Sequence, residues 1–199
     1  RDLPAFLGGS RPRLSLQVDG RAITYYELAF GLNSIWDVDR VEVFRSPQTT
    51  TQGRNSIAGA IFVETRNPAE EWEGKVRLVA GDFATRQASV VVSGPLLDDQ
   101  LAFRIAGDLR RSKTSSQITD AAVGIDPNRD DSELVRFKIV AKPQAIPGAH
   151  LNLTYVHGHS QMPQIEGVEA PFEQRRNPNA TYGIFAITTD ALTGKFKYV

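Results

Sequence analysis

The side chains best suited to metal binding are those of His150, His157 and His159. On a strand, His157 and His159 would lie on the same face, since side chains alternate between the two faces. A zinc site takes three or four protein ligands, but no third ligand accompanies this pair and the chain has no cysteine. The sequence therefore predicts no metal site, and a position at the mouth of a loop accounts for the two histidines.

Two glycines, Gly53 and Gly59, border a polar segment that could suggest a phosphate-binding loop. Such a loop leads into a helix, whereas a strand pattern follows here. We therefore expect Gly53 and Gly59, like Gly20 in an Asp-Gly pair, to serve tight turns or close backbone packing. No Ser/His/Asp order, carboxylate pair or nucleotide loop stands out, so we predict no enzymatic activity and no cofactor.

The composition limits the remaining classes of protein. The chain has 199 residues with 23 Lys+Arg and 23 Asp+Glu, so bulk charge does not indicate nucleic-acid binding. The longest apolar run, residues 57–63, is far shorter than the roughly 18 residues of a membrane helix. Because the chain opens with Arg-Asp-Leu-Pro and closes within an alternating segment, we expect it to be part of a longer protein.

The first 69 residues have the pattern of short strands and turns. Residues 14–18 alternate and end in Asp19-Gly20, which is a strong signal for a tight hairpin turn. Residues 27–38 carry apolar side chains at spacings of three and four, which predicts a short helix. Two further alternating segments predict strands, at residues 41–45 and 60–65.

From residue 70 on, longer alternating strands separate apolar from ionic side chains, and short connections alternate with long polar loops at 112–131 and 160–180. This pattern predicts an up-and-down antiparallel sheet. A soluble sandwich would bury the apolar face against a second sheet. An outer-membrane barrel would turn that face toward lipid. Ionic side chains at consecutive positions of the opposite face favour the barrel.

Four blocks in the first part carry a more specific signal. They are VDG at 18–20, DRVEVFRSPQ at 39–48, GRNSIAGAI at 53–61 and TRNP at 65–68. In order and in spacing, this set resembles the plug domain of TonB-dependent outer-membrane receptors. The strands that follow stand where the barrel of that family begins.

The resemblance implies a mostly β fold. Residues 1–69 would form an N-terminally incomplete plug domain with a small mixed sheet. Residues 70–199 would form the first antiparallel strands of a 22-stranded transmembrane barrel in the outer membrane of a Gram-negative bacterium, surrounded by lipid. The implied function is uptake of a ferric siderophore or similar metal complex, energised by the periplasmic protein TonB. The alternatives are uptake of a saccharide or other organic nutrient, and a soluble all-β ligand-binding module.

The resemblance also suggests which residues could act. The candidates for ligand contact at the plug apex are Thr24, Tyr25, Tyr26, Arg11 and Arg13. Packing in a core or at the membrane interface is the alternative for the two tyrosines. Arg45 and Glu42 would form ion pairs between plug and barrel, unless they belong to a solvated strand face.

Overall fold

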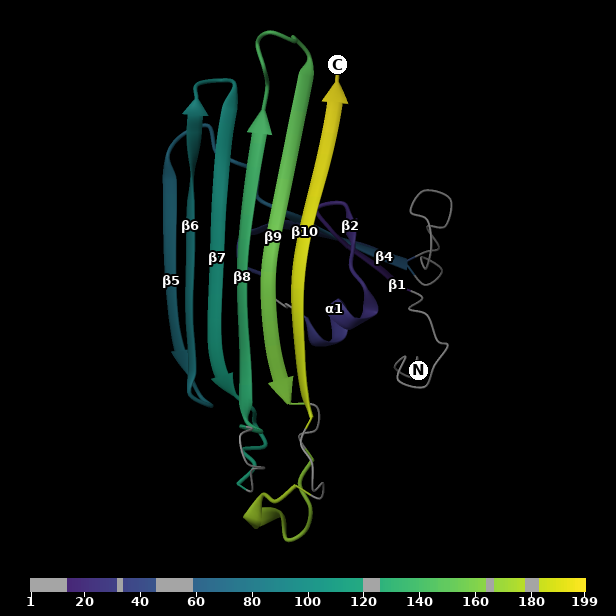
Figure 1. The fold of residues 1–199 in the computed structure, drawn as a ribbon, viewed down its shortest axis with the longest axis vertical. Coiled ribbons are helices and arrows are strands. Elements are labelled where there is room, and N and C mark those ends of the chain that lie inside the picture. Colours follow the sequence, from purple (N-terminus) through teal and green to yellow (C-terminus); the bar gives the residue numbers. More distant parts are fainter. Residues whose placement is uncertain (1–13, 32–33, 46–58, 120–125, 164–166, 178–182) are drawn as a thin grey trace.

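The computed structural model describes residues 14–31, 34–45, 59–119, 126–163, 167–177 and 183–199, which form two sheets (Figure 1). The elements in chain order are β1 (Leu14–Val18), β2 (Arg21–Ala22), α1 (Tyr25–Phe30), β3 (Val38–Phe44), β4 (Gly59–Thr65), β5 (Glu73–Gly81), β6 (Thr85–Leu97), β7 (Leu101–Lys113), β8 (Arg129–Ala141), β9 (Ala149–Pro163), the 3-10 helix η2 (Phe172–Gln174) and β10 (Ile184–Tyr198). Within these described ranges, no helix has the length and hydropathy to cross a bilayer.

The small sheet has the strand order β2-β1-β4-β3 and is mixed, as predicted. Its hairpin β1-β2 turns at Asp19 and Gly20, whose φ angles of 52° and 85° are both positive, as a type I′ turn requires. Strand β1 pairs in parallel with β4, and β4 pairs antiparallel with β3. At the start of β4, Gly59 has a φ of 136°, and a Cβ there would lie 2.2 Å from the carbonyl oxygen of Phe44. Both glycines are therefore required by the backbone path.

Helix α1 begins earlier and ends sooner than the predicted helix at 27–38. A capping box fixes its start, because the Glu27 amide donates to Thr24 Oγ1 at 3.2 Å and the Glu27 carboxylate accepts from the Thr24 amide at 3.0 Å. The helix ends at Gly31, whose amide donates to the Glu27 carbonyl at 2.9 Å. The apolar spacing beyond it instead carries Trp36 into a contact with the second sheet.

The large sheet has the order β10-β9-β8-β7-β6-β5, and every neighbouring pair is antiparallel. Tight connections at 98–100 and 142–148 lie at one end, and the long connections after β7 and β9 lie at the other (Figure 1). The β5-β6 connection at 82–84 is a short exception at the long-loop end. Up-and-down strands with this asymmetry match the predicted topology.

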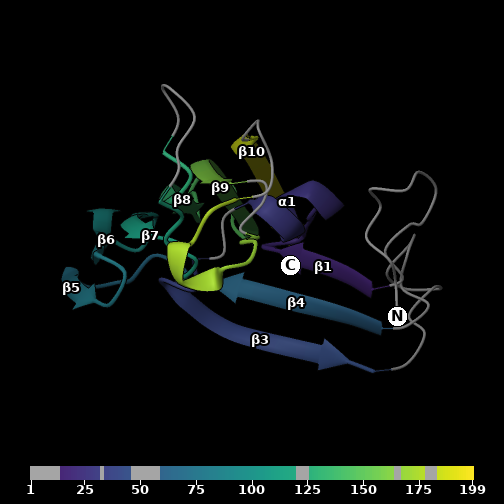
Figure 2. The same ribbon diagram turned by 90° about the horizontal axis from the view of Figure 1, so that it is seen from below.

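The small sheet and α1 lie on the concave side of the large sheet (Figure 2). The side chains that the large sheet buries on that side are mainly polar or charged, among them Ser89, Arg104, Asp108, Arg136 and Lys138. Its opposite side exposes apolar residues such as Val76, Leu78, Ile105, Leu109 and Val135. A soluble sandwich would have the reverse arrangement. The fold class predicted for the chain, barrel strands around a mixed plug sheet, is thereby confirmed.

Candidate functional site between the two sheets

Asp19, in the β1-β2 turn, joins the small sheet to the inner wall, meaning the concave face of β5–β10. Its Oδ1 accepts from the Thr65 amide at 3.0 Å, and its Oδ2 accepts from the Thr65 hydroxyl at 2.7 Å. Lys138 on β8 reaches in from the wall, and its Nζ donates to Asp19 Oδ1 at 3.1 Å and to the Thr65 carbonyl at 2.8 Å. Both side chains of the ion pair are buried. The turn residue is thus the centre of a contact between the two sheets.

The protonation state of Asp19 follows from this setting. Burial by itself would raise the pKa of the carboxyl group, but the hydrogen bonds from Thr65 and the charge of Lys138 outweigh it and lower the pKa below its usual value. The carboxylate therefore remains ionised into the acid range. Its interactions stabilise the docked sheet at neutral pH.

Trp36 makes an apolar contact between the sheets. Its side chain is buried, and its indole Nε1 donates to the Val90 carbonyl on β6 at 3.0 Å. Two cations of β5 lie over the indole ring, with Lys75 Nζ at 5.3 Å and Arg77 Cζ at 4.7 Å from the ring centroid. Such cation–π contacts strengthen when they are shielded from water. Trp36 thereby holds the segment before β3 against two wall strands.

Asp37 adds a second ion pair next to Trp36. Arg104 on β7 donates to it in a bidentate manner, from Nε to Oδ2 at 2.7 Å and from Nη2 to Oδ1 at 2.6 Å. The remaining Nη1 of Arg104 donates to Glu73 on β5. The side chains of both Arg104 and Asp37 are only 4% exposed. A bidentate arginine–carboxylate pair of this kind is stronger than a pair joined by a single hydrogen bond, and it is well suited to a buried interface.

Hydroxyl and carboxylate groups extend the contact toward the long-loop end. Ser34 Oγ, from the small-sheet side, donates to Asp108 Oδ2 on β7. Asp108 also accepts from Ser89 Oγ at 2.7 Å and from Gln87 Nε2 at 2.9 Å, both on β6. This carboxylate is therefore shared between the wall and the segment that docks on it.

Helix α1 approaches the last strand through Glu27. Arg21 Nη1 donates to Glu27 Oε1 at 2.8 Å, and Thr189 Oγ1 on β10 donates to the same oxygen at 3.3 Å. Burial would raise the pKa of Glu27, but hydrogen bonds from the Thr24 amide and from Arg21 lower it overall. Glu27 thus serves the helix cap, the small sheet and the wall at once.

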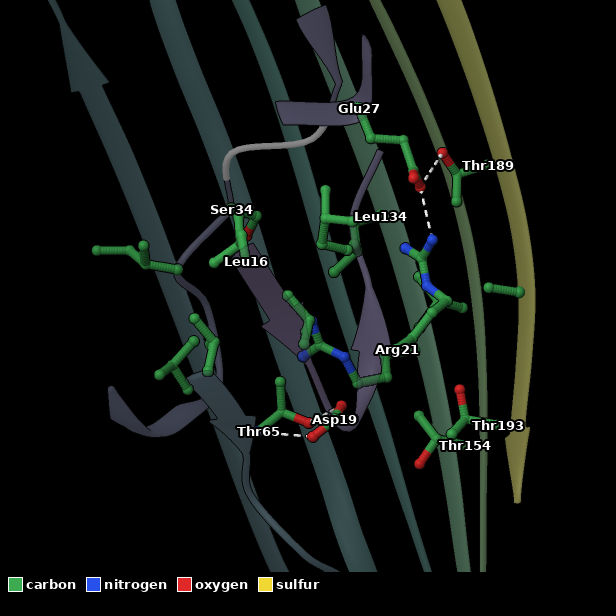
Figure 3. Close-up of a pocket in the computed structure, with 18 of the residues that line it drawn as sticks. Leu16, Asp19, Arg21, Glu27, Ser34, Thr65, Leu134, Thr154, Thr189 and Thr193 are labelled. Carbon is green, nitrogen blue, oxygen red and sulfur yellow. Dashed lines mark hydrogen bonds and ion pairs between the residues drawn. The ribbon is translucent and has the colours of Figure 1, made fainter. Parts of the chain in front are cut away.

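A cavity of about 390 Å³ lies between these contacts (Figure 3). Its floor is apolar where β1 and β4 face it, with Leu16 and Val63. The wall contributes Leu134, Thr154 and Thr193. Figure 3 shows Leu16 from the small sheet and Leu134, Thr154 and Thr193 from the wall around one space, with the Asp19–Thr65 and Arg21–Glu27 contacts at its edges.

Arg136 on β8 also lines the cavity and is a cation without an ion pair among the described residues. Its side chain is 5% exposed, and its Nη1 donates to the Trp36 carbonyl at 3.5 Å, a long hydrogen bond. Its Nε has no hydrogen-bond partner within the described parts of the chain. A buried guanidinium held so loosely adds polarity to the interface without holding it closed.

The predicted ligand contacts fall partly outside what the structure describes. Arg11 and Arg13 lie outside the described residues, as does the side chain of Tyr25. Thr24 serves as the N-cap of α1, and Tyr26 is 60% exposed. The role of these residues in ligand binding stays a prediction.

The predicted interface pair does not account for the ion pairs seen between the sheets. Glu42 pairs with Arg40 at 3.3 Å within its own strand, and Arg45 is exposed at the end of β3. Their pairing with barrel strands stays a prediction, and Gly53 lies outside the described residues. No group of three or more His, Cys, Asp or Glu suited to a metal occurs in the described ranges.

The residues that do join the sheets were missed as a site in the sequence, although the alternation placed Arg104, Arg136 and Lys138 on one polar face. The register adds the missing signal, because Arg104 and Lys138 are direct cross-strand partners. Two cations placed opposite each other repel unless acids neutralise them. Asp37 and Asp19 supply those acids from the small sheet.

Comparison with known proteins agrees with this geometry. No model of a known protein family matches the chain. The chain is 29% identical over 126 residues to the ferrioxamine B receptor of Salmonella typhimurium, covering 60% of this chain and 18% of that protein. It is 32% identical over 101 residues to the ferric enterobactin receptor PirA of Pseudomonas aeruginosa, covering 47% of this chain and 13% of that protein. The chain therefore spans less than a fifth of the length of these relatives.

Solved structures share the fold. The ferric yersiniabactin uptake receptor FyuA of Yersinia pestis superposes with a TM-score of 0.77 at 20% identity, over 94% of this chain and 29% of that one. The ferric-catecholate import receptor Fiu of E. coli K12 gives 0.68 at 17% identity, over 96% and 30% of the two chains. The sequence relatives and the shared fold agree with the resemblance of the chain to the TonB-dependent outer-membrane receptors.

Proposed function

We propose that this chain contributes the plug, residues 1–69, and the first barrel strands, residues 70–199, of a receptor in the outer membrane of a Gram-negative bacterium. The intact receptor binds a ferric siderophore at its outer face and passes it inward, with energy supplied by TonB. The names of the relatives support this, since they are receptors for ferrioxamine B and ferric enterobactin. These relatives are transport receptors rather than enzymes, and we propose no catalytic step.

The observation that carries the proposal is the ionic character of the contact between plug and wall. Asp19–Lys138 and Asp37–Arg104 are buried ion pairs, while the buried apolar cluster among the described residues is small and consists of Trp36, Val91 and Ala106. Opening an apolar interface exposes hydrocarbon to water at a cost proportional to its area. Opening an ionic one returns both charges to water, which offsets much of the lost attraction. A plug held in this way is stable at rest and can be displaced by a pulling partner.

Ligand binding is proposed at the plug surface that faces the long loops. Helix α1 lies near that part of the wall, because Glu27 contacts Thr189, five residues from the loop-side start of β10 at Ile184. Tyr26 on this helix is exposed, as an aromatic contact for a solute requires. Arg11, Arg13, Thr24 and Tyr25 complete the proposed contact set.

The test is uptake of radioactive iron by iron-starved cells with and without the gene for the intact receptor. We expect deletion to abolish uptake of iron from ferrioxamine B, enterobactin or yersiniabactin, with the other chelates serving as controls. Uptake should be lost equally in cells that lack TonB. Unchanged uptake of all three chelates, together with loss of growth on an oligosaccharide, would replace this proposal with nutrient uptake.

A further inference from the structure

The convex face of the large sheet carries a row of basic side chains at its long-loop end. The register places Arg86, Arg111, Lys113 and Arg129 on the same face as the apolar side chains Ile105 and Leu109. We call these four residues the outer basic cluster. All four are exposed, so they face away from the plug and toward the surroundings of the barrel.

On the convex face, the apolar side chains give way to polar ones along a slanted line. Going toward the long loops, the first outward polar residues on β6 to β10 are Arg86, Arg111, Glu133, His157 and Asp190, each preceded on that face by an apolar residue: Ala88, Leu109, Val135, Tyr155 and Leu192. On β10 the outward residues Ala186 and Ile184, beyond Asp190, are apolar again. By register, Ala88 is level with Leu109. Leu192 lies four residues closer to the short-turn end than that level. Four residues span about 14 Å along a strand, and four strand spacings span about 19 Å across the sheet. The line is therefore inclined by about 35° to the direction perpendicular to the strands.

This inclination equals the strand tilt of an outer-membrane barrel, about 35–45°. A line inclined by that angle within the sheet is level in a barrel whose strands are tilted by the same angle. The change from apolar to polar side chains therefore marks one plane around the barrel, at the outer edge of the lipid. The outer basic cluster lies just beyond this plane, at the depth of lipid headgroups.

The cluster also contains like charges in direct opposition. Arg86 is the cross-strand partner of Arg111, and Lys113 is the partner of Arg129. Cations placed opposite each other on one face destabilise a sheet unless anions lie between them. Two unfavourable pairs side by side therefore call for additional negative charge.

The described residues supply only part of that charge. Asp131 pairs with Arg111 at 3.2 Å and with Arg129, and Glu133 pairs with Arg111 at 3.6 Å. Arg86 and Lys113 have no ion pair with any described residue. The four cations thus exceed the two nearby acids, and the two unpaired cations flank the cluster.

We propose that the outer basic cluster binds the phosphate groups of the glycolipid that forms the outer leaflet around the barrel. The depth of the cluster, its outward direction and its excess positive charge all match a phosphorylated headgroup anchored in that leaflet. Arginine binds phosphate in a bidentate manner, and a bound phosphate would relieve the repulsion between Arg86 and Arg111. This proposal rests on the placement of the chain in an outer-membrane barrel but not on the identity of the transported solute.

The experiment uses the intact receptor, purified in a neutral detergent and stripped of lipid, with native mass spectrometry counting bound diphosphoryl lipid A. The variant Arg86→Gln/Lys113→Gln removes the two unpaired cations and leaves the ion pairs of Arg111 and Arg129 in place. We expect about 25-fold weaker binding, since each cation near a lipid surface contributes about fivefold. The control Lys142→Gln/Lys197→Gln removes the same charge near the short-turn end and should bind lipid A as the parent does.

Four results would overturn the proposal. One is unchanged lipid A binding by the Arg86→Gln/Lys113→Gln variant, and another is an equal loss in the control variant. The third is equal binding of lipid A whose phosphates have been removed. Competition by millimolar inorganic phosphate that displaces all bound lipid A would point to a site for free anions instead. Because the readout is lipid binding, failure here leaves the siderophore uptake test unaffected.

Discussion

Replacing Asp19 with asparagine should release the small sheet from the wall. The asparagine side chain would keep the size of the original, and its oxygen could still accept from the Thr65 amide and from Lys138, but it would lose the negative charge that Lys138 requires. Lys138 is 3% exposed, so its cation would stay buried beside neutral oxygens, without an opposite charge. Breaking a buried ion pair from one side costs about 3–5 kcal/mol.

The assay is hydrogen exchange of the β4 amides in the intact receptor, because these amides exchange only when the small sheet opens. A loss of about 3–5 kcal/mol predicts exchange faster by about two to four orders of magnitude at neutral pH. Glu42→Gln is the matched control, since it removes a carboxylate that is 45% exposed and paired within its own strand. Such a pair contributes less than about 1 kcal/mol.

A second substitution makes the test specific. Adding Lys138→Met to Asp19→Asn removes the stranded cation, so exchange should slow again by at least tenfold. Unchanged exchange in Asp19→Asn would show that this ion pair does not hold the sheet. Faster exchange with no recovery in the double variant would attribute the effect to the turn and to Thr65 rather than to the contact with the wall.

Three further changes test other parts of the interface by the same exchange measurement. The folded pKa of Asp19 lies below its unfolded value of about 3.9, so its stabilisation is complete above about pH 5 and is lost as pH falls through the folded pKa. Acid should therefore lower the protection factors of the β4 amides in the parent more than in Asp19→Asn. Gly59→Ala should destabilise the small sheet by more than about 1 kcal/mol, because a Cβ would meet the Phe44 carbonyl; equal stability would show that the backbone can shift. Arg136→Met should leave stability unchanged or raise it, because its guanidinium is buried without an ion pair among the described residues; a large loss would reveal a partner outside them.

The sequence predicts those features of this fold that are local. The Asp19-Gly20 turn, the strands of both sheets and the alternation of ionic and apolar faces depend on residues close together in the chain. The resemblance of residues 18–68 to a plug further predicted that a small sheet precedes the barrel strands in the chain. The predicted bounds of the helix, 27–38, were wrong, because the apolar residues after Gly31 do not form a helical face. Trp36 among them docks on the large sheet instead.

The candidate site could not be predicted in the same way. Lys138 meets Asp19 across 119 positions and Arg104 meets Asp37 across 67, so neither pair leaves a local pattern. Glu42 and Arg45 were chosen because they lie on a plug strand, but strand position does not say which face meets the wall. Only the docked arrangement of the two sheets selects Asp19 and Asp37 from the 23 acids of the chain.

The inner wall would be electrostatically unfavourable without the plug. Arg104 and Lys138 are opposite each other, and Arg136 lies two residues before Lys138 on the same face. Asp37 and Asp19 neutralise the first two from the small sheet. The docking of the plug is therefore coupled to the stability of the wall through charge, and this coupling has a measurable consequence.

The double variant Asp19→Asn/Asp37→Asn should show it. With both acids removed, the three buried cations of the wall, Arg104, Arg136 and Lys138, lack the neighbouring acids of the plug, and added salt should screen their repulsion. We expect the thermal stability of this variant to rise between 0.05 and 0.5 M salt, a range over which the Debye length falls from about 14 to about 4 Å. The parent, whose charges are paired at close range, should change little. If both proteins respond equally to salt, the wall cations are neutralised by groups other than the plug acids, and the inferred coupling is wrong.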